Sequence, residues 1–185
     1  MDSKNRVFSL LGGIFLMASG FFLLVTTTTN MARSAAAAAD FGNIIALNID
    51  LLFLLCGLFL LLRKPRVAAS MMCAICGLYV LNVALHIVIR SSSYNWFTTI
   101  CIFLAYALFA AGMFGKGVYA LIMCLAAAFF RFMPFITQLI GFPHLIKYSN
   151  ALLLINNISS LFGSMLLIAA MVRAGLYLFS LRKKA

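Results

Sequence analysis

Long apolar runs dominate this chain and restrict what it can fold into. The stretch from Ile44 to Leu62 has nineteen residues with a single ionisable side chain, Asp50, and it ends at a basic cluster. A helix of ~20 residues crosses a hydrocarbon layer about 30 Å thick. The chain is 65% hydrophobic and 9% charged, whereas roughly a quarter of the residues of a soluble domain are charged. We therefore predict a polytopic membrane protein.

Six apolar runs are long enough to span a membrane as helices. They cover residues 7–25, 44–62, 67–89, 97–114, 117–141 and 150–172. The runs are longer than the roughly nine to eleven residues of a barrel strand, and they do not alternate between apolar and polar residues. The sequence therefore predicts an all-α fold, a single bundle of six transmembrane helices within residues 1–185.

The last span has two possible placements, because the apolar stretch from residue 150 to residue 181 is longer than a bilayer requires. In the first, the span ends near Arg173, and residues 173–185 form a basic cytoplasmic tail that can include an interfacial helix. In the second, the span covers residues 158–181 and buries Arg173. We favour the first, because a long arginine side chain reaches the membrane surface easily and a basic helix suits an anionic leaflet.

The basic residues of the short connections predict the orientation. If the N-terminus is cytoplasmic, nine Lys and Arg residues lie inside, and only Arg33, Arg90 and Lys147 lie outside. We therefore expect a protein of the plasma membrane or inner membrane, with both termini in the cytoplasm. The formal charge of +11 then reflects this topology and an attraction to anionic lipid at the cytoplasmic face. It gives no indication of nucleic-acid binding.

Polar residues inside the spans identify a candidate site. An ionisable group in hydrocarbon costs at least ~2.5 kcal/mol, so it usually has a partner or faces a wet cavity. The obvious partner of Asp50 is Arg131. With the predicted topology, polar residues of four helices fall roughly 5 to 15 Å below the outer surface. We expect an outward-facing, partly hydrated pocket lined by Asp50, Asn82, His86, Arg131, Gln138 and Asn156.

The same residues can instead be structural. Amide, hydroxyl and imidazole groups in membranes often hydrogen-bond between helices, and Asp50 with Arg131 could form a buried pair that fixes helix register. Small residues such as Gly13 and Gly20 allow close contact between helix backbones. On this interpretation the polar residues hold the bundle together and bind nothing.

The sequence lacks the usual patterns of catalytic and metal sites. Only one of the three acidic residues lies in a span, so no pair of carboxylates is available for acid–base work or metal binding. Phosphate-binding and hydrolase motifs are not found. Cys73 and Cys76 form a C-x-x-C pattern, but burial in lipid near a reducing compartment argues against thiol redox chemistry. We expect no enzymatic activity, no metal and no cofactor.

The predicted plan comprises six helices, both termini inside, a long first outer loop from Thr26 to Asn43 and a polar level near the outer surface. It resembles the substrate-binding subunits of energy-coupling-factor vitamin transporters. The resemblance covers architecture only, and it implies a small-molecule-binding subunit that acts with partner subunits. We predict small-molecule binding or transport, in which Arg131 binds an anionic group and Asp50 is its counter-charge or a cation ligand. The alternative is a non-catalytic accessory or scaffold subunit of a membrane complex.

Overall fold

The computed structural model describes residues 3–32, 41–90, 95–147 and 150–181. These residues form six α-helices, each long and apolar enough to cross a membrane. The helices are α1 (Ser3–Met31), α3 (Phe41–Leu61), α4 (Pro65–Arg90), α5 (Trp96–Phe114), α6 (Val118–Lys147) and α7 (Ala151–Ser180). The prediction of an all-α bundle with six spans is confirmed, and the chain is a multi-pass integral membrane protein.

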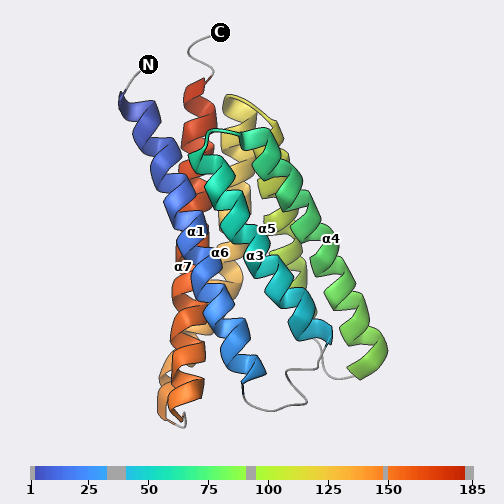
Figure 1. Cartoon of the computed structure of the whole chain (residues 1–185). Helices are drawn as coiled ribbons and strands as arrows, with labels where there is room; N and C mark the ends of the chain where they lie inside the picture. The colour runs from blue at the N-terminus through green and yellow to red at the C-terminus, as the bar shows by residue number, and fades with distance from the viewer. Residues whose placement is uncertain (1–2, 33–40, 91–94, 148–149, 182–185) are drawn as a thin grey trace.

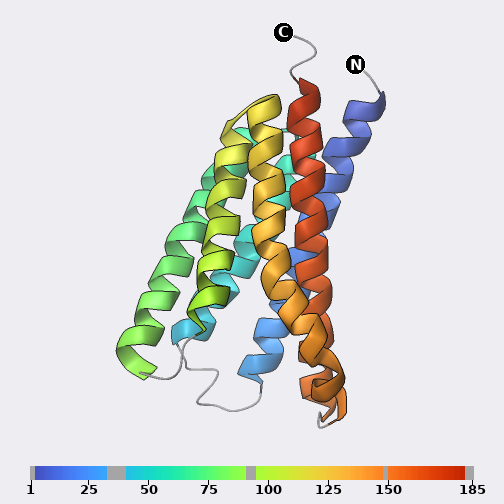
Figure 2. The same ribbon diagram turned by 180° about the vertical axis from the view of Figure 1, so that it is seen from behind.

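The helices form two layers of three. Figures 1 and 2 show α1, α3 and α4 in one layer and α7, α6 and α5 in the other. Each helix packs against its neighbours in the chain, and α7 packs against α1, so the six helices close into a ring. The middle helices α3 and α6 face each other across the ring without extensive backbone contact between their described residues. Side chains therefore fill the space between the two layers.

The first helix is longer than its apolar run. It continues through a row of threonines, which begins at Thr26, and ends at Met31. The sequence analysis placed an outer loop from Thr26 to Asn43, so the first residues of that loop are helical. Three of these threonines donate their hydroxyl protons to main-chain oxygens one turn earlier, Thr26 to Phe22 at 3.0 Å and Thr29 to Val25 at 2.8 Å among them. Such bonds satisfy the hydroxyl groups within the helix, so the polar stretch remains helical. Residues 33–40 of the predicted loop lie outside the described residues.

The last helix continues past Arg173, the residue near which we predicted the end of the span. Helix α7 runs without interruption through Arg173 to Ser180. Its final turns carry Ala174, Tyr177 and Leu178, which are buried in the bundle. Packing of this apolar face explains why the helix continues past the arginine. Residues 182–185 of the predicted basic tail lie outside the described residues.

Glycines bring α1 and α3 into close contact. A Cβ atom built at Gly57 would lie 2.6 Å from the main-chain nitrogen of Met17 and 2.8 Å from the carbonyl oxygen of Gly13. A Cβ atom at Gly20 would lie 2.8 Å from the main-chain nitrogen of Leu54. The structural interpretation of Gly13 and Gly20 is therefore correct, and their partner is a helix of the same chain. Close approach of backbones is a usual source of helix association in membranes.

The turn that precedes α6 requires the backbone conformation of Gly117. Its backbone lies in the left-handed region (φ 67°), and its amide donates to the carbonyl oxygen of Leu178 at 3.3 Å. A side chain costs about 1–2 kcal/mol in this region. We expect Gly117→Ala to lower the free energy of unfolding by about 1 kcal/mol, measured by thermal unfolding in detergent.

The control for this variant is Gly141→Ala. Gly141 lies within α6 and has no atom within 4 Å of a built Cβ. Alanine is favoured over glycine inside a helix, so the control should keep or slightly raise stability. Equal losses in both variants would contradict the assigned role of the Gly117 backbone.

Candidate functional site

Asp50 is held by a threonine of the neighbouring helix. The carboxylate lies in the middle of α3 with only 5% of the residue exposed. The Thr27 hydroxyl of α1 donates to one carboxylate oxygen, Oδ2, at 2.6 Å. Thr27 is itself buried. Because the donor is a neutral hydroxyl group, this bond orients the carboxylate but supplies no countercharge.

Arg131 lies in the opposite layer, on α6. The residue is 7% exposed, and its Nη2 donates to the Ser164 hydroxyl oxygen of α7 at 2.8 Å. Its Nε is buried and has no hydrogen-bond partner. A guanidinium group has five N–H donors and is always charged in proteins, so Arg131 retains donor capacity and an uncompensated positive charge.

The expected ion pair between these two residues is not formed. Asp50 and Arg131 are both described, yet the partner of Asp50 is Thr27 and that of Arg131 is Ser164. The prediction that Arg131 is the direct partner of Asp50 is therefore wrong. The physical reason is their placement, because α3 and α6 are the middle helices of opposite layers and do not pack closely together.

Aromatic side chains fill the space near the two charges. Tyr106 of α5 is buried, with 5% of the residue exposed. Its ring contacts Phe53 edge to face at a centroid distance of 5.4 Å and Tyr79 at 5.6 Å. Phe53 lies one turn after Asp50 on α3. Gly20 of α1 packs against the main chain of Asp50, and its neighbour Ser19 donates to Gly163, which precedes the Ser164 partner of Arg131. The acid and the arginine therefore lie at a similar level of the bundle.

Two of the predicted site residues are engaged in contacts between helices. The Gln138 amide donates to the Ser160 hydroxyl oxygen at 2.7 Å, which joins α6 to α7. The Asn156 side-chain oxygen accepts from Thr29 at 3.3 Å, which joins α7 to α1. Such bonds contribute to helix association, so these two amides have a structural role in addition to any contact with a ligand.

The other two predicted residues lie on α4. The side-chain oxygen of Asn82 is buried and has no hydrogen-bond partner, so it can accept a bond from a ligand or a water molecule. The backbone of His86 is helical, one turn further along α4, but its side chain lies outside the described part of the structure. The six predicted residues thus separate into two charged groups, two interhelical amides, one free acceptor and one undescribed side chain.

Three residues of the site were not predicted. Thr27 and Ser164 bond to Asp50 and Arg131, and Tyr106 packs against Phe53, but hydroxyl groups are common in membrane helices and give a weak signal. Thr27 was assigned to a loop because it follows the apolar run. The threonine row could have been recognised as helical from the ability of threonine to bond one turn back.

Cysteine chemistry has no support from the geometry. All five cysteines are free thiols, and Cys73 faces outwards while Cys56, Cys101 and Cys124 are buried on other helices. No group of His, Cys, Asp and Glu suitable for a metal ion occurs among the described residues.

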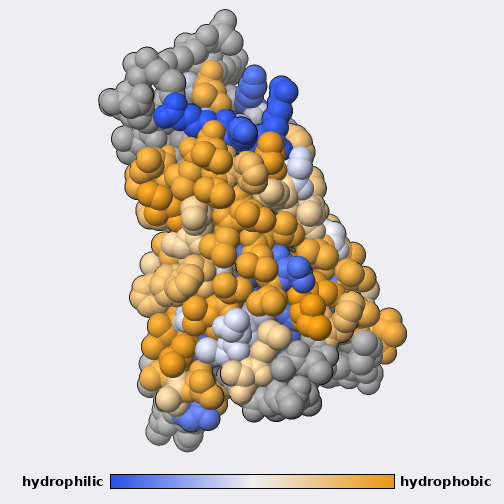
Figure 3. Space-filling model, in the orientation of Figure 1, coloured by the Kyte–Doolittle hydropathy of each residue, from blue (hydrophilic) through white to orange (hydrophobic). Residues whose placement is uncertain are grey.

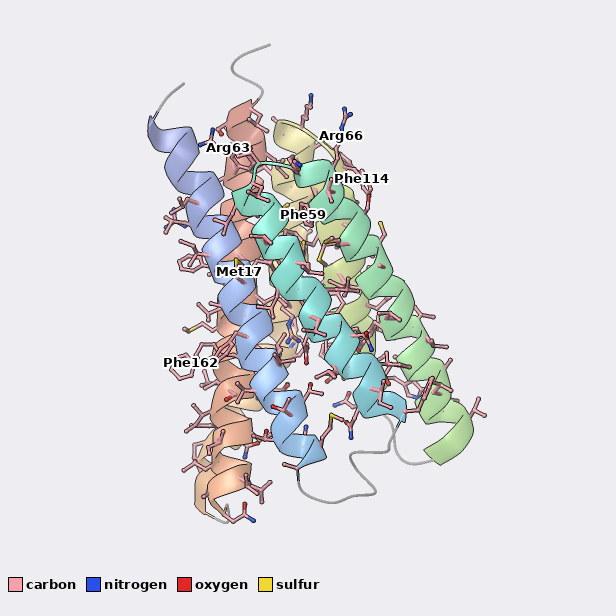
Figure 4. All side chains as sticks on the ribbon, in the orientation of Figure 1. Met17, Phe59, Arg63, Arg66, Phe114 and Phe162 are labelled. Atoms are coloured by element: carbon pink, nitrogen blue, oxygen red, sulfur yellow. The ribbon has the colours of Figure 1, made fainter. Side chains whose placement is uncertain are left out.

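The outer surface divides into an apolar belt and a basic end. Figure 3 shows mostly hydrophobic side chains over the middle of one face, with a smaller group of hydrophilic ones in its lower half, and a larger hydrophilic group at the end where α1 begins. Arg63 and Arg66, labelled in Figure 4, lie at this end, Arg63 in the connection between α3 and α4 and Arg66 in the first turn of α4. Both are exposed, as are Lys64 and Lys116.

Comparison with known proteins finds no matching family, no similar characterised protein and no similar solved structure.

Proposed function

We propose that this protein binds or transports a small polar molecule in the region between its two layers of helices. The observation that carries the proposal is that Asp50 and Arg131, a buried acid and a buried arginine, form no ion pair with each other. Ionisable groups inside a membrane are costly and usually mark a functional site. A ligand that offers hydrogen bonds and charge would offset this cost.

The proposed orientation places the basic end in the cytoplasm. Its support is the distribution of Lys and Arg, with Arg63, Lys64, Arg66 and Lys116 exposed at the end where α1 begins and α7 ends. Basic residues accumulate on the cytoplasmic side of membrane proteins and attract anionic lipid. The ligand would then enter from the opposite, outer side. We propose a plasma or inner membrane location and, as for other small membrane subunits, action with partner subunits.

The test neutralises both charges at once, combining Asp50→Asn with Arg131→Gln. The net charge of the interior is unchanged, and both replacements can keep a hydrogen bond to their hydroxyl partners. We therefore expect a folded bundle with unchanged helix content by circular dichroism. Wild-type protein in lipid nanodiscs should retain a small molecule, detected by mass spectrometry of the extract, and the double variant should lose at least about 90% of it, as expected for two charge-assisted contacts.

The matched control combines Asn48→Ala with Arg66→Gln. Asn48 is an exposed residue of α3 that bonds only to its own helix, at the carbonyl oxygen of Ile44, 2.8 Å away. Arg66 is exposed at the basic end. The control should retain the wild-type molecule. If the folded double variant retained it as well, the proposed site would be wrong.

A second candidate function is that of an accessory or scaffold subunit without a ligand. It is favoured by the polar bonds that join neighbouring helices, including the Ser19 hydroxyl of α1 donating to the carbonyl oxygen of Gly163 of α7 at 2.8 Å. The same double variant distinguishes the two functions. If the charges only hold the bundle together, the variant will lose helix content and will not accumulate in the membrane.

A further inference from the structure

We propose that the ligand is a zwitterion whose cationic group contacts Asp50 and whose carboxylate contacts Arg131. This inference rests on the proposed function and narrows it to one class of molecule. The sequence left two roles open for Asp50, a counter-charge for Arg131 or a ligand for a cation. The absence of an ion pair between these two described residues favours the second role.

Charge balance within the site favours a ligand with both signs. An anion bound at Arg131 would leave the buried carboxylate of Asp50 without a cation and would be repelled by it. A cation bound at Asp50 would meet the corresponding repulsion from Arg131. A zwitterion offers an opposite charge to each group and adds no net charge to the interior, where charge is expensive.

The Arg131 end suits a carboxylate. Nη2 already donates to Ser164, whereas the buried Nε has no partner. A carboxylate oxygen can accept from Nε in the charge-assisted geometry that arginine favours. A phosphate monoester carries about two negative charges near neutral pH, one more than Arg131 neutralises. The single positive charge therefore selects a singly charged acid.

The Asp50 end suits an ammonium group. Thr27 occupies one carboxylate oxygen, and a carboxylate has further lone pairs for a second donor. Phe53 lies one turn along α3 and contacts Tyr106 edge to face. Aromatic rings attract cations through their π electrons. The acid and the neighbouring rings together provide the surroundings that an organic ammonium group requires.

The experiment measures equilibrium binding of labelled zwitterions to the full chain in lipid nanodiscs. The panel is glycine, β-alanine, 4-aminobutyrate and 6-aminohexanoate, each compared with the amine and the carboxylate of the same chain length. We expect at least one zwitterion to bind about tenfold more tightly than both of its singly charged analogues, a usual loss when a charged partner is removed. The chain length of the zwitterion that binds most tightly indicates the distance between Asp50 and Arg131.

The variants assign each end of the ligand. Asp50→Asn should reduce the affinity for the best zwitterion to that of its carboxylate analogue, and Arg131→Gln should reduce it to that of its amine analogue. Arg66→Gln, which removes an exposed arginine, should leave all affinities unchanged. The inference is overturned if no zwitterion binds, or if a singly charged analogue binds as tightly as the zwitterion.

Failure of this inference can be told apart from failure of the proposed function. A wild-type extract that contains a singly charged molecule, lost in the double variant, would overturn the zwitterion and keep the binding site. Identical extracts from the folded wild type and the folded double variant would overturn both.

Discussion

Gly57→Ala should be among the most destabilising single substitutions in the molecule. The added Cβ would lie 2.6 Å from the main-chain nitrogen of Met17 and 2.8 Å from the carbonyl oxygen of Gly13. Main-chain atoms cannot rotate away as a side chain can, so α1 and α3 must separate. We expect a loss of about 2–3 kcal/mol in the free energy of unfolding, at the upper end of the usual cost of overpacking. Unfolding of the purified protein in mixed detergent micelles measures it.

The matched control for this prediction is Gly77→Ala. Gly77 is also a glycine inside a helix, but a Cβ built there meets no atom within 4 Å. The same chemical change should therefore be neutral or slightly stabilising, because alanine is the better helix former. A Gly57→Ala variant as stable as Gly77→Ala would show that α1 and α3 do not approach as described.

Phe53→Ala should have a still larger effect, because it leaves the core underpacked where Gly57→Ala overpacks it. Phe53 is completely buried between the layers, and its ring packs against Tyr106. Its removal leaves a cavity beside the candidate site, and such truncations usually cost about 3–5 kcal/mol. The expected result is a large drop in thermal stability together with weaker retention of any ligand.

Phe97→Ala is the corresponding control. Phe97 is at the start of α5 and exposes 59% of its surface towards the lipid side. Its truncation removes the same atoms but opens no internal cavity, so stability should change by less than about 0.5 kcal/mol. Similar losses for Phe53 and Phe97 would contradict the assignment of Phe53 to the core between the layers.

The fold could be predicted from the sequence because membrane spanning is a demanding constraint. Each helix must satisfy its own main-chain hydrogen bonds in lipid, so a long apolar run has few alternatives to a helix. The ends were harder to place. A boundary drawn from hydropathy falls at the first polar residue, whereas the helix ends where its hydrogen bonds and its packing end. Thr26 and Arg173 are polar residues that continue a helix for these reasons.

The partners in the candidate site could be predicted only in part. The free-energy cost of an ionisable group inside a membrane identified Asp50 and Arg131 as candidate site residues. Both are buried. It did not identify their neighbours, because the sequence gives the depth of a residue but neither its rotation about the helix nor the order of the helices. Thr27 and Ser164 meet the two charges only because α1 packs beside α3 and α7 beside α6.

Closure of the ring by α1 and α7 has a consequence for biogenesis. The helices nearest in space to α1 are α3 and α7, one made soon after it and the other five helices later in the described order. One flank of α1 must therefore stay against lipid, or against an insertion chaperone, until α7 has entered the bilayer. Ser19, which bonds to α7 in the folded protein, needs another acceptor during that interval, such as a main-chain oxygen one turn earlier in α1. The ring of six helices therefore closes only when α7 inserts, and a chain stalled before α7 would leave this flank of α1 without its partner.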